Sequence, residues 1–468
     1  MIAYRILRAL GHLALRWFYR EIEVVGMERM PVEGPVLLAS NHPNALVDAL
    51  VVGCTLRRPV VLTAKATLLE NSITRILLRT VGVVPLRRAS DALRPGGDGV
   101  LDPARNADAF AAVLDALEAG GVVLLFPEGK SHSDPALAPL KTGLARIAIM
   151  ARVERQLASV PIVPIGLTFE RKWEPRSRVL MHLGAPIISD EPNDAVALTQ
   201  RVEAGLRSVT LNFRSADEAR WLFSISTVLA EVLDEFRPLH RPDPPLADQV
   251  RVAHRIVAIV PELPDLDREI GARVERFLSR LATFEHLLEK NAVAASDVQM
   301  STSTAAGTWF AIREASIAGL AGPLALWGRV NHWVPLRIAR SLALRKSRTP
   351  DEPAMNTIVA GLLLVLAFYI TQISLVVWWL GGVTAVLYGA SLPLSATWDF
   401  RYADRLRRGI VRVRTYLQFR RDPRLCQRLR DDLAWLRGEA VALDAMIAPM
   451  RTPYPVGERY PRGTLTET

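Results

Sequence analysis

A stretch of about forty residues without a single charged side chain, residues 356–398, most strongly limits what this chain can fold into. Roughly twenty apolar residues cross a bilayer as a helix, so this length suits two membrane helices joined by a turn. Trp378 and Trp379, followed by Gly381 and Gly382, supply interfacial aromatic rings and a turn near the middle. We therefore expect a transmembrane hairpin over residues 356–398.

Basic residues flank this segment on both sides. They are Arg337, Arg340, Arg345, Lys346 and Arg348 before it, and Arg401, Arg405, Arg407, Arg408, Arg412 and Arg414 after it. Positive charge at both ends predicts that both ends face the cytoplasm, which a hairpin satisfies and a single span does not. Pro393 makes the short second limb a candidate for a tilted or re-entrant half-span. A pair of buried core helices is the alternative.

The composition adds a soluble part to this membrane segment. Of the 468 residues 50% are hydrophobic and 23% are charged, which suits neither a fully soluble protein nor a pure membrane bundle. Two cysteines, Cys54 and Cys426, exclude a disulfide framework and a four-cysteine zinc site, and they fit a reducing, cytoplasm-facing location. The net charge of +10 collects around the apolar segment, which favours a membrane surface over nucleic acid as the partner.

The first residues, 1–21, are not a cleavable signal, because Arg5, Arg8 and Arg16 interrupt the apolar run. Apolar residues recur there at helical spacing with arginines between them. This pattern predicts an amphipathic helix that lies on anionic lipid, or that packs on the soluble domain.

Residues 22–215 alternate short apolar runs with helical stretches, which predicts an α/β domain with a mixed, mostly parallel sheet flanked by helices. The expected strands are residues 22–25, 36–40, 60–63, 83–86, 122–126, 162–169 and 179–183. The expected helices are residues 45–54, 72–80, 107–119 and 141–156, with a long loop over 89–105.

Open α/β sheets place their sites where strands end, and the first candidate block follows strand 36–40. It contains His42, Asn44 and Asp48. If Asn44 is the N-cap, His42 lies on the loop and Asp48 in the first helical turn. A carboxylate there can reach the imidazole, select its tautomer and support proton abstraction.

Three further blocks lie at strand ends. Arg87 and Arg88 follow strand 83–86 and suit phosphate recognition, with solvated surface arginines as the alternative. A Phe-Pro-Glu-Gly turn with lysines nearby is a candidate anion cradle; its polar and turn residues are Glu128, Gly129, Lys130, Ser131 and Lys141. The Val-Pro-rich strand near residue 162 suits a core or pocket wall.

These blocks, in this order over about residues 1–215, resemble the glycerophospholipid acyltransferase superfamily. That family carries an NH-x4-D block, a Gly-to-Arg strand, an FPEG block and a Val-Pro strand. This chain departs from it in two places: Asp48 lies one position further from His42, and Lys130, Ser131 and His132 replace the usual Thr-Arg-Ser. The longer spacing, the 89–105 loop and the hairpin are similar to the fungal-type glycerol-3-phosphate/dihydroxyacetone-phosphate branch and its bacterial relatives.

The resemblance implies a membrane-bound O-acyltransferase of phospholipid biosynthesis. It would transfer a fatty acyl group from acyl-CoA or acyl carrier protein to the hydroxyl of glycerol-3-phosphate or lysophosphatidate. His42 would be the general base and Asp48 would orient it. The implied substrate-binding residues are Asn44, Lys65, Arg87, Arg88, Glu128, Gly129, Lys130, Ser131 and Lys141. Neither a metal nor a cofactor is expected, because a thioester is already an activated donor.

Two alternatives stay open. The chain could acylate another lysophospholipid or lipid acceptor, or it could be a non-catalytic lipid-binding membrane scaffold with the same fold. A serine hydrolase is disfavoured, because the sequence has no G-x-S-x-G motif.

The rest of the chain carries no chemical motif. We expect a helical region over 216–350, a basic helical region over 399–447 and a disordered tail over 448–468. The Ala-, Leu- and Trp-rich part near residues 315–344 is a hypothetical contact with the bilayer. The expected location is the cytoplasmic (inner) membrane with the catalytic domain on the cytoplasmic side; the oligomeric state is not predicted.

Overall fold

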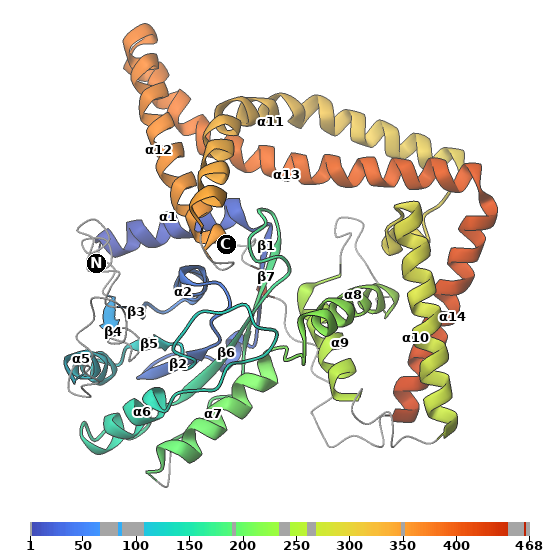
Figure 1. Ribbon diagram of the computed structural model, residues 1–468. Helices are drawn as coiled ribbons and strands as arrows, with labels where there is room; N and C mark the ends of the chain where they lie inside the picture. The colour runs from blue at the N-terminus through green and yellow to red at the C-terminus, as the bar shows by residue number, and fades with distance from the viewer. Residues whose placement is uncertain are drawn as a thin grey trace. The chain divides into compact units, whose positions relative to one another are not determined.

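The computed structural model describes residues 2–65, 83–86, 107–189, 193–233, 244–259, 268–347, 352–447 and 463–464. The chain divides into two compact units. The first comprises Met1–Arg214, Leu342–Val359 and Tyr460–Thr468, and the second comprises Ser215–Ser341 and Ala360–Arg459. The first unit holds the sheet and the second is helical (Figure 1).

The first unit is built on one sheet with strand order β4-β3-β5-β2-β6-β7-β1-β8. The strands are β1 Glu21–Val25, β2 Val36–Ser40, β3 Val60–Lys65, β4 Val84–Leu86, β5 Val122–Leu125, β6 Ile162–Phe169, β7 Arg178–Leu183 and β8 Gly463–Thr464. Pairing is parallel except between β6 and β7 and between β1 and β8. The predicted mixed, mostly parallel sheet is confirmed.

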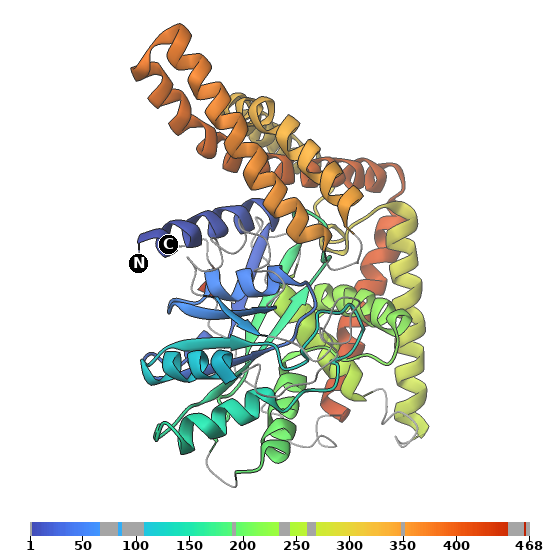
Figure 2. The ribbon, with the colours of Figure 1, turned by 60° about the vertical axis from the view of Figure 1, so that its left-hand side comes forward.

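Helices cover both faces of this sheet, which is why its strands read as nearly unbroken apolar runs. The helices are α1 Ile2–Phe18, α2 Leu46–Thr55, α5 Ala107–Glu118, α6 Gly143–Val153 and α7 Ala195–Val209. One core joins α1 and α2 to the sheet, and a second core joins α5, α6 and α7 to it (Figure 2). Consecutive residues of β2 alternate between the two cores, since Val36 and Leu38 belong to the first and Leu37 and Ala39 to the second.

The N-terminal helix α1 packs on α2 inside this unit. A Cβ atom added at Gly11 would lie 3.0 Å from Leu50 Cδ1, and Leu15 and Phe18 are buried. Packing on the domain, one of the two expectations for this helix, is therefore observed. Contact of its outer face with lipid stays a prediction.

The second unit consists of helices α8 Ala216–Leu233, α9 Leu246–Ile259, α10 Arg268–Asn291, α11 Thr304–Lys346, α12 Pro353–Leu380, α13 Gly382–Arg421 and α14 Pro423–Ile447, with the ends of α11 and α12 assigned to the first unit. α12 and α13 form the expected helical hairpin, with Gly381 in the left-handed region (φ 85°) at the turn. α13 continues without a break through Pro393 to Arg421. Among the described residues, α12 alone is long and apolar enough to cross a membrane by itself.

Several predictions fall outside the described residues. They are the helix over 72–80, the loop over 89–105, Arg87 and Arg88. Most of the tail over 448–468 is also outside them. Gly463 and Thr464 form the short strand β8, for which the sequence shows no pattern.

A close approach of β6 to α7 makes the first testable prediction. A Cβ atom at Gly166 would lie 1.9 Å from the Val209 carbonyl oxygen, whereas one at Gly143 would meet nothing within 4 Å. We expect Gly166→Ala to lower the free energy of unfolding by about 1–3 kcal/mol or more, because overpacking forces the backbone to shift. Gly143→Ala, the matched control, should leave it unchanged or slightly higher in thermal unfolding of the full chain. Equal midpoints for the two variants would contradict the close packing of β6 on α7.

Candidate active site

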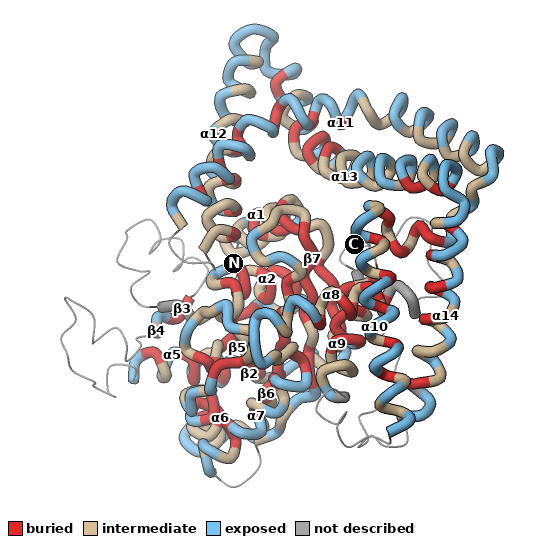
Figure 3. The backbone as a smooth tube through the Cα atoms, turned by 45° about the vertical axis from the view of Figure 1, so that its right-hand side comes forward, coloured by how far each residue is buried: buried red, intermediate tan, exposed pale blue. Residues whose placement is uncertain are grey.

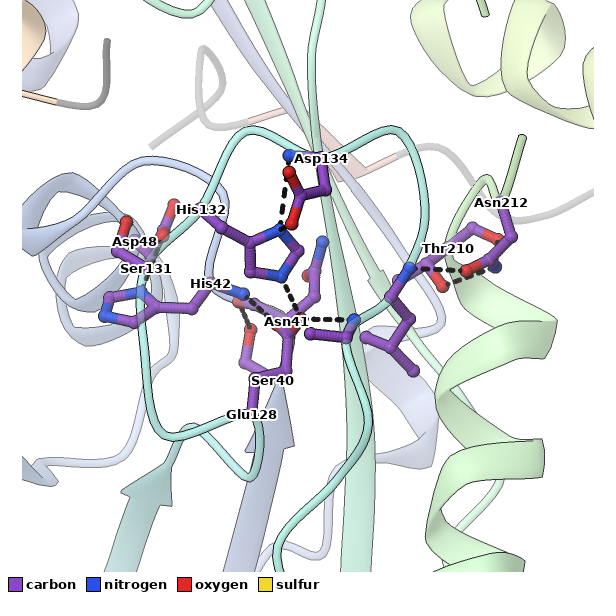
Figure 4. Close-up of polar contacts among 12 residues, drawn as sticks. Ser40, Asn41, His42, Asp48, Glu128, Ser131, His132, Asp134, Thr210 and Asn212 are labelled. Carbon is purple, nitrogen blue, oxygen red and sulfur yellow. Dashed lines mark hydrogen bonds and ion pairs between the residues drawn. The ribbon is translucent and has the colours of Figure 1, made fainter. Parts of the chain in front are cut away.

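The candidate site forms where the loops after β2 and β5 meet. These two strands are parallel neighbours, with Ala39 opposite Leu125. His42 and Glu128 each lie three positions further along their strands, so the pairing register brings them to the same point of the sheet edge. The His42 backbone N–H accordingly donates to Glu128 Oε1 at 2.8 Å (Figure 4).

The His42 imidazole is oriented by Asp48 on the first turn of α2. His42 Nδ1 lies 2.9 Å from Asp48 Oδ2. An ionised carboxylate can only accept, so Nδ1 carries the hydrogen and Nε2 has the free lone pair. The Phe126 ring stacks on the imidazole with the ring centroids 3.9 Å apart, which limits rotation of the side chain. This tautomer presents Nε2 as a proton acceptor.

Asp48 is fully buried, and its environment is electrostatically mixed. Burial raises the pKa of Asp48, while the hydrogen bonds from His42 and the Asn44 N–H and the charge of Lys172 act in the opposite direction. The Asn44 N–H donates to Asp48 Oδ2 at 2.8 Å, so this oxygen serves both the imidazole and the loop backbone. Asp48 Oδ1 is buried without a hydrogen-bond partner among the described residues. The unpaired buried oxygen lowers the stability of the folded protein, and the carboxylate nevertheless lies where it contacts the His42 imidazole.

Glu128 uses both of its carboxylate oxygens inside the protein. Oε1 accepts the His42 N–H, and Oε2 accepts the Ala138 N–H at 2.9 Å and contacts His132 Nε2. The residue is 3% exposed. Glu128 thus holds the loop that carries His42, which is a different task from bonding a ligand hydroxyl.

The residues after Glu128 clamp the same loop from the other side. The His132 N–H donates to the His42 carbonyl oxygen at 3.2 Å. Ser131 Oγ accepts the N–H of Ala45 at 3.0 Å, and Ala45, at φ 48°, is the N-cap of α2. His132 Nδ1 in turn accepts the Asp134 N–H at 3.2 Å. Backbone groups on both sides of the histidine are therefore fixed by one turn (Figure 4).

Two asparagines anchor the β2 loop to the rest of the sheet. Asn41 makes a pair of bonds to the backbone of Leu167 on β6, at 2.7 Å and 3.0 Å. The Asn44 side chain donates to the Tyr19 hydroxyl and to the Lys172 carbonyl oxygen, both at 3.2 Å. Asn44 precedes the N-cap and does not occupy it, so the prediction that it caps α2 is wrong.

The cationic side chains near the turn stay exposed. Lys130 and Lys141 are both exposed. Gly129 has a φ of 72°, a backbone conformation that favours glycine, and the Lys141 side chain crosses the turn beside it. The Gly129 N–H donates to the Phe126 carbonyl oxygen at 3.0 Å. This turn N–H is therefore used inside the protein, and anion binding by the two lysines stays a prediction.

The structure thus brings most of the predicted residues together. His42, Asn44, Asp48, Glu128, Gly129, Lys130, Ser131 and Lys141 surround the meeting point of the two loops. Lys65 is at the end of β3, but its side chain, like Arg87 and Arg88, lies outside the described residues. Substrate binding by the listed residues stays a prediction.

Sequence reasoning gave no role to four residues that complete the site: Tyr19, Asn41, Phe126 and His132. Their contacts with Asn44, Leu167 and His42 join residues 25 to 126 positions apart, which no local pattern reveals. Among the described residues, no group of three His, Cys, Asp or Glu side chains could hold a metal ion.

A histidine whose Nδ1–H is held by a buried carboxylate at the edge of a mostly parallel sheet is suited to proton transfer. Comparison with known proteins also indicates an enzyme in this part of the chain. Residues 21–168 match the family model described as Acyltransferase.

The chain is similar to curated enzymes over part of its length. It is 35% identical over 117 residues to glycerol-3-phosphate O-acyltransferase 2 of Saccharomyces cerevisiae, which covers 23% of this chain and 16% of the yeast protein. It is 26% identical over 178 residues to a chloroplastic 1-acyl-sn-glycerol-3-phosphate acyltransferase of Brassica napus, which covers 37% of this chain and 45% of the plant protein. The match thus spans less than half of either relative.

A solved structure, the 1-acyl-sn-glycerophosphate acyltransferase PlsC from Thermotoga maritima, is 17% identical with a TM-score of 0.34, covering 44% of this chain and 78% of that chain. The part of the chain that matches the Acyltransferase family model, residues 21–168, contains the His42–Asp48 pair. The resemblance to this family predicted from the motif blocks is confirmed.

Replacing Asp48 should separate activity from stability. Asp48→Asn keeps the shape but removes the anion that selects the His42 tautomer, so we expect activity to fall by about 10²- to 10⁴-fold. Because the substitution also removes a buried charge, the free energy of unfolding should stay equal or rise. Acyl-transfer rates and thermal unfolding of the same preparation check both. A loss of activity that only follows a loss of folded protein would contradict the orienting role.

Replacing Glu128 tests the clamp. Glu128→Gln places an amide group against the Ala138 N–H or the His42 N–H, where two donors would face each other. We expect activity to fall by about 10- to 100-fold, the equivalent of a lost hydrogen bond to a charged group. Ser133→Ala, an exposed neighbour in the same loop, is the matched control and should keep full activity. An unaffected Glu128→Gln enzyme would contradict the clamp.

Proposed function

We propose that this protein is a membrane-bound O-acyltransferase that transfers a fatty acyl group to the hydroxyl of a glycerol phosphate acceptor. The acceptor is glycerol-3-phosphate or lysophosphatidate, and the donor is acyl-CoA or acyl carrier protein. The observation that supports it best is the contact of His42 Nδ1 with Asp48 Oδ2 at 2.9 Å. Both residues lie in the part of the chain that matches the Acyltransferase family model. The printed names of the relatives support the acceptor class.

The reaction follows from this geometry. His42 Nε2 takes the proton of the acceptor hydroxyl while the oxygen attacks the thioester carbonyl carbon. Asp48 stabilises the imidazolium that forms, because its carboxylate faces the Nδ1–H. Collapse of the tetrahedral intermediate forms the ester, breaks the carbon–sulfur bond and returns the proton from Nε2 to the thiolate. The atoms balance without a metal or a redox step.

Phosphate binding is assigned to the cationic residues around the turn. Lys130 and Lys141 are exposed and so have their ammonium groups available to a ligand. Lys65, at the end of β3, and Arg87 and Arg88, which follow β4 in the sequence and lie outside the described residues, are proposed to contribute as well. Asn44, Glu128 and Ser131 are proposed to act mainly by holding the loop, because their polar groups bond to protein groups.

The membrane part of the proposal rests on the hairpin. α12 has the length and composition of a membrane span, and basic residues flank the hairpin. We propose the cytoplasmic (inner) membrane as the location, with the catalytic domain on the cytoplasmic side. The alternatives are another lysophospholipid or lipid acceptor, or a non-catalytic scaffold, and the assay below distinguishes them.

The decisive experiment compares wild type, His42→Ala and His286→Ala in isolated membranes. Each receives labelled palmitoyl-CoA or acyl carrier protein together with glycerol-3-phosphate, dihydroxyacetone phosphate or lysophosphatidate. We expect incorporation into one acceptor and a loss of at least about 10²- to 10⁴-fold in His42→Ala. His286, an exposed histidine of α10, is the control and should be dispensable. Activity that survives His42→Ala would exclude this mechanism, and silence with every pair of substrates would favour the scaffold.

Lys141→Gln tests the phosphate assignment. Removing one ammonium group should raise KM for the phosphorylated acceptor by about 10-fold and leave kcat within a few-fold, since the contact is the same in ground and transition states. Lys290→Gln on the exposed surface of α10 is the matched control. An unchanged KM would remove Lys141 from the acceptor site.

A further inference from the structure

The long helix α11 buries small and polar side chains and exposes large apolar ones. Its buried positions carry small or polar side chains, among them Ala325, Asn331 and His332. Its exposed positions carry large apolar ones: Trp309, Ile312, Leu320, Leu326, Trp327, Val330, Trp333 and Ile338. Buried positions gather where α11, α12 and α13 meet, and exposed positions line their outer sides (Figure 3). A helix on the surface of a water-soluble protein shows the opposite arrangement.

A hydrogen-bond network joins these three helices from within. Asn331 Oδ1 accepts from Gln372 Nε2 of α12 at 3.1 Å and from the Tyr388 hydroxyl of α13 at 2.9 Å. Its Nδ2 group donates to the Trp327 carbonyl oxygen of α11 at 2.8 Å. One asparagine therefore links all three helices.

His332 extends the network. Its Nδ1 lies 2.7 Å from the Gly328 carbonyl oxygen, which can only accept, so Nδ1 carries the hydrogen. Its Nε2 lies 2.5 Å from the Tyr369 hydroxyl of α12, which donates to it. Two side chains of α11 also bond to α13 at the edge of this network. Arg329 pairs with Asp399, and the Trp327 indole donates to Ser391 Oγ at 3.1 Å.

Close backbone contact accompanies this network. A Cβ atom at Gly328 would lie 2.2 Å from the Ser395 carbonyl oxygen of α13. Small residues at the contact and polar side chains bonded between helices are what holds helices together in lipid, where apolar side chains gain nothing by avoiding the solvent. Polar groups at membrane depth face the inside of a bundle and are paired there.

Charge near α11 limits the depth at which residues 315–336 can lie. Glu314 pairs with Arg405, and a Cβ atom at Gly322 would lie 3.8 Å from the Tyr402 hydroxyl, so this part of α11 runs beside the charged residues of α13 that follow the hairpin. A helix that lies in the bilayer surface with its apolar side chains toward the acyl chains is consistent with both features. Arg329 is the single charged residue in this range, and Asp399 pairs with it. Arg313 precedes the range, and Arg337 and Arg340 follow it, where they can meet anionic headgroups.

We propose that residues 315–336 of α11 lie in the surface of the same bilayer that α12 enters, with their large apolar side chains against lipid acyl chains. The second unit then presents three helices to the membrane and not a two-helix hairpin alone. The inference rests on the membrane part of the proposed function and not on the catalytic part. The mean hydropathy of α11 is low because Arg329, Asn331 and His332 lower its average, although Asn331 and His332 are bonded inside the bundle and Arg329 is paired with Asp399 at its rim.

The test uses single cysteines that carry an environment-sensitive NBD fluorophore, in the full chain reconstituted into phosphatidylcholine–phosphatidylglycerol vesicles. The native cysteines can stay, because Cys426 is buried and burial raises the pKa of the Cys54 thiol to about 11. Wild type treated with the same fluorophore checks that the two native cysteines stay unlabelled. Leu320→Cys and Val330→Cys report on α11; they replace side chains that are 85% and 66% exposed. Ile370→Cys reports on α12, and Ala282→Cys, on the exposed surface of α10, reports on water.

Each labelled protein is quenched by iodide in water or by doxyl-labelled lipid. We expect doxyl lipid to quench positions 320 and 330 as strongly as position 370, with iodide quenching them several-fold less than position 282. If position 370 behaves as lipid-exposed while 320 and 330 behave like 282, α11 is outside the bilayer and the inference is wrong. If position 370 also behaves like 282, the membrane hairpin of the proposed function fails too. Protection of 320 and 330 from both quenchers would show a protein cover, such as a second copy, and would equally overturn the inference.

Discussion

The parallel pairing of β2 with β5 is the interaction on which the candidate site depends. With Ala39 opposite Leu125, the loops after the two strands start side by side, and His42 meets Glu128 three positions later. A shift of one residue would turn the side chains of β2 to the opposite faces and separate these partners. The alternation of β2 residues between two buried cores opposes such a shift, because every position of the strand is already packed. Core packing and chemistry are thus set by the same register.

The second loop gains its role from this pairing. The Phe-Pro-Glu-Gly turn could be expected to present its donors and its carboxylate to a ligand. Instead, Glu128 accepts from the backbone of His42 and Ala138, while Phe126 stacks on the imidazole. The turn therefore holds the histidine, and the exposed ammonium groups of Lys130 and Lys141 are left for an anion.

The helical unit illustrates where averaging over a sequence fails. The uncharged stretch that forms α12 and the start of α13 was recognisable, since nearly all of its residues are apolar. α11 carries Arg329, Asn331 and His332 among its apolar residues, and an average over the sequence does not contain the information that they have partners on other helices. The spacing of small and polar residues along α11 shows which of them have partners only after the face that contacts α12 and α13 is known.

The sequence by itself determined the strands β1 to β7, the helical hairpin and the resemblance to the acyltransferases, because burial on both faces produces unbroken apolar runs and because the motif blocks follow one another in a recognisable order. It also placed Asp48 in the first turn of α2, near enough to reach His42. Only the tertiary structure decided that Ala45 and not Asn44 caps that helix, that α1 packs on α2, and that Tyr19, Asn41 and the His132 backbone support the site. The physical reason is common to all three. Such contacts join residues far apart in the chain, and their geometry follows from strand order and register, which no local pattern encodes.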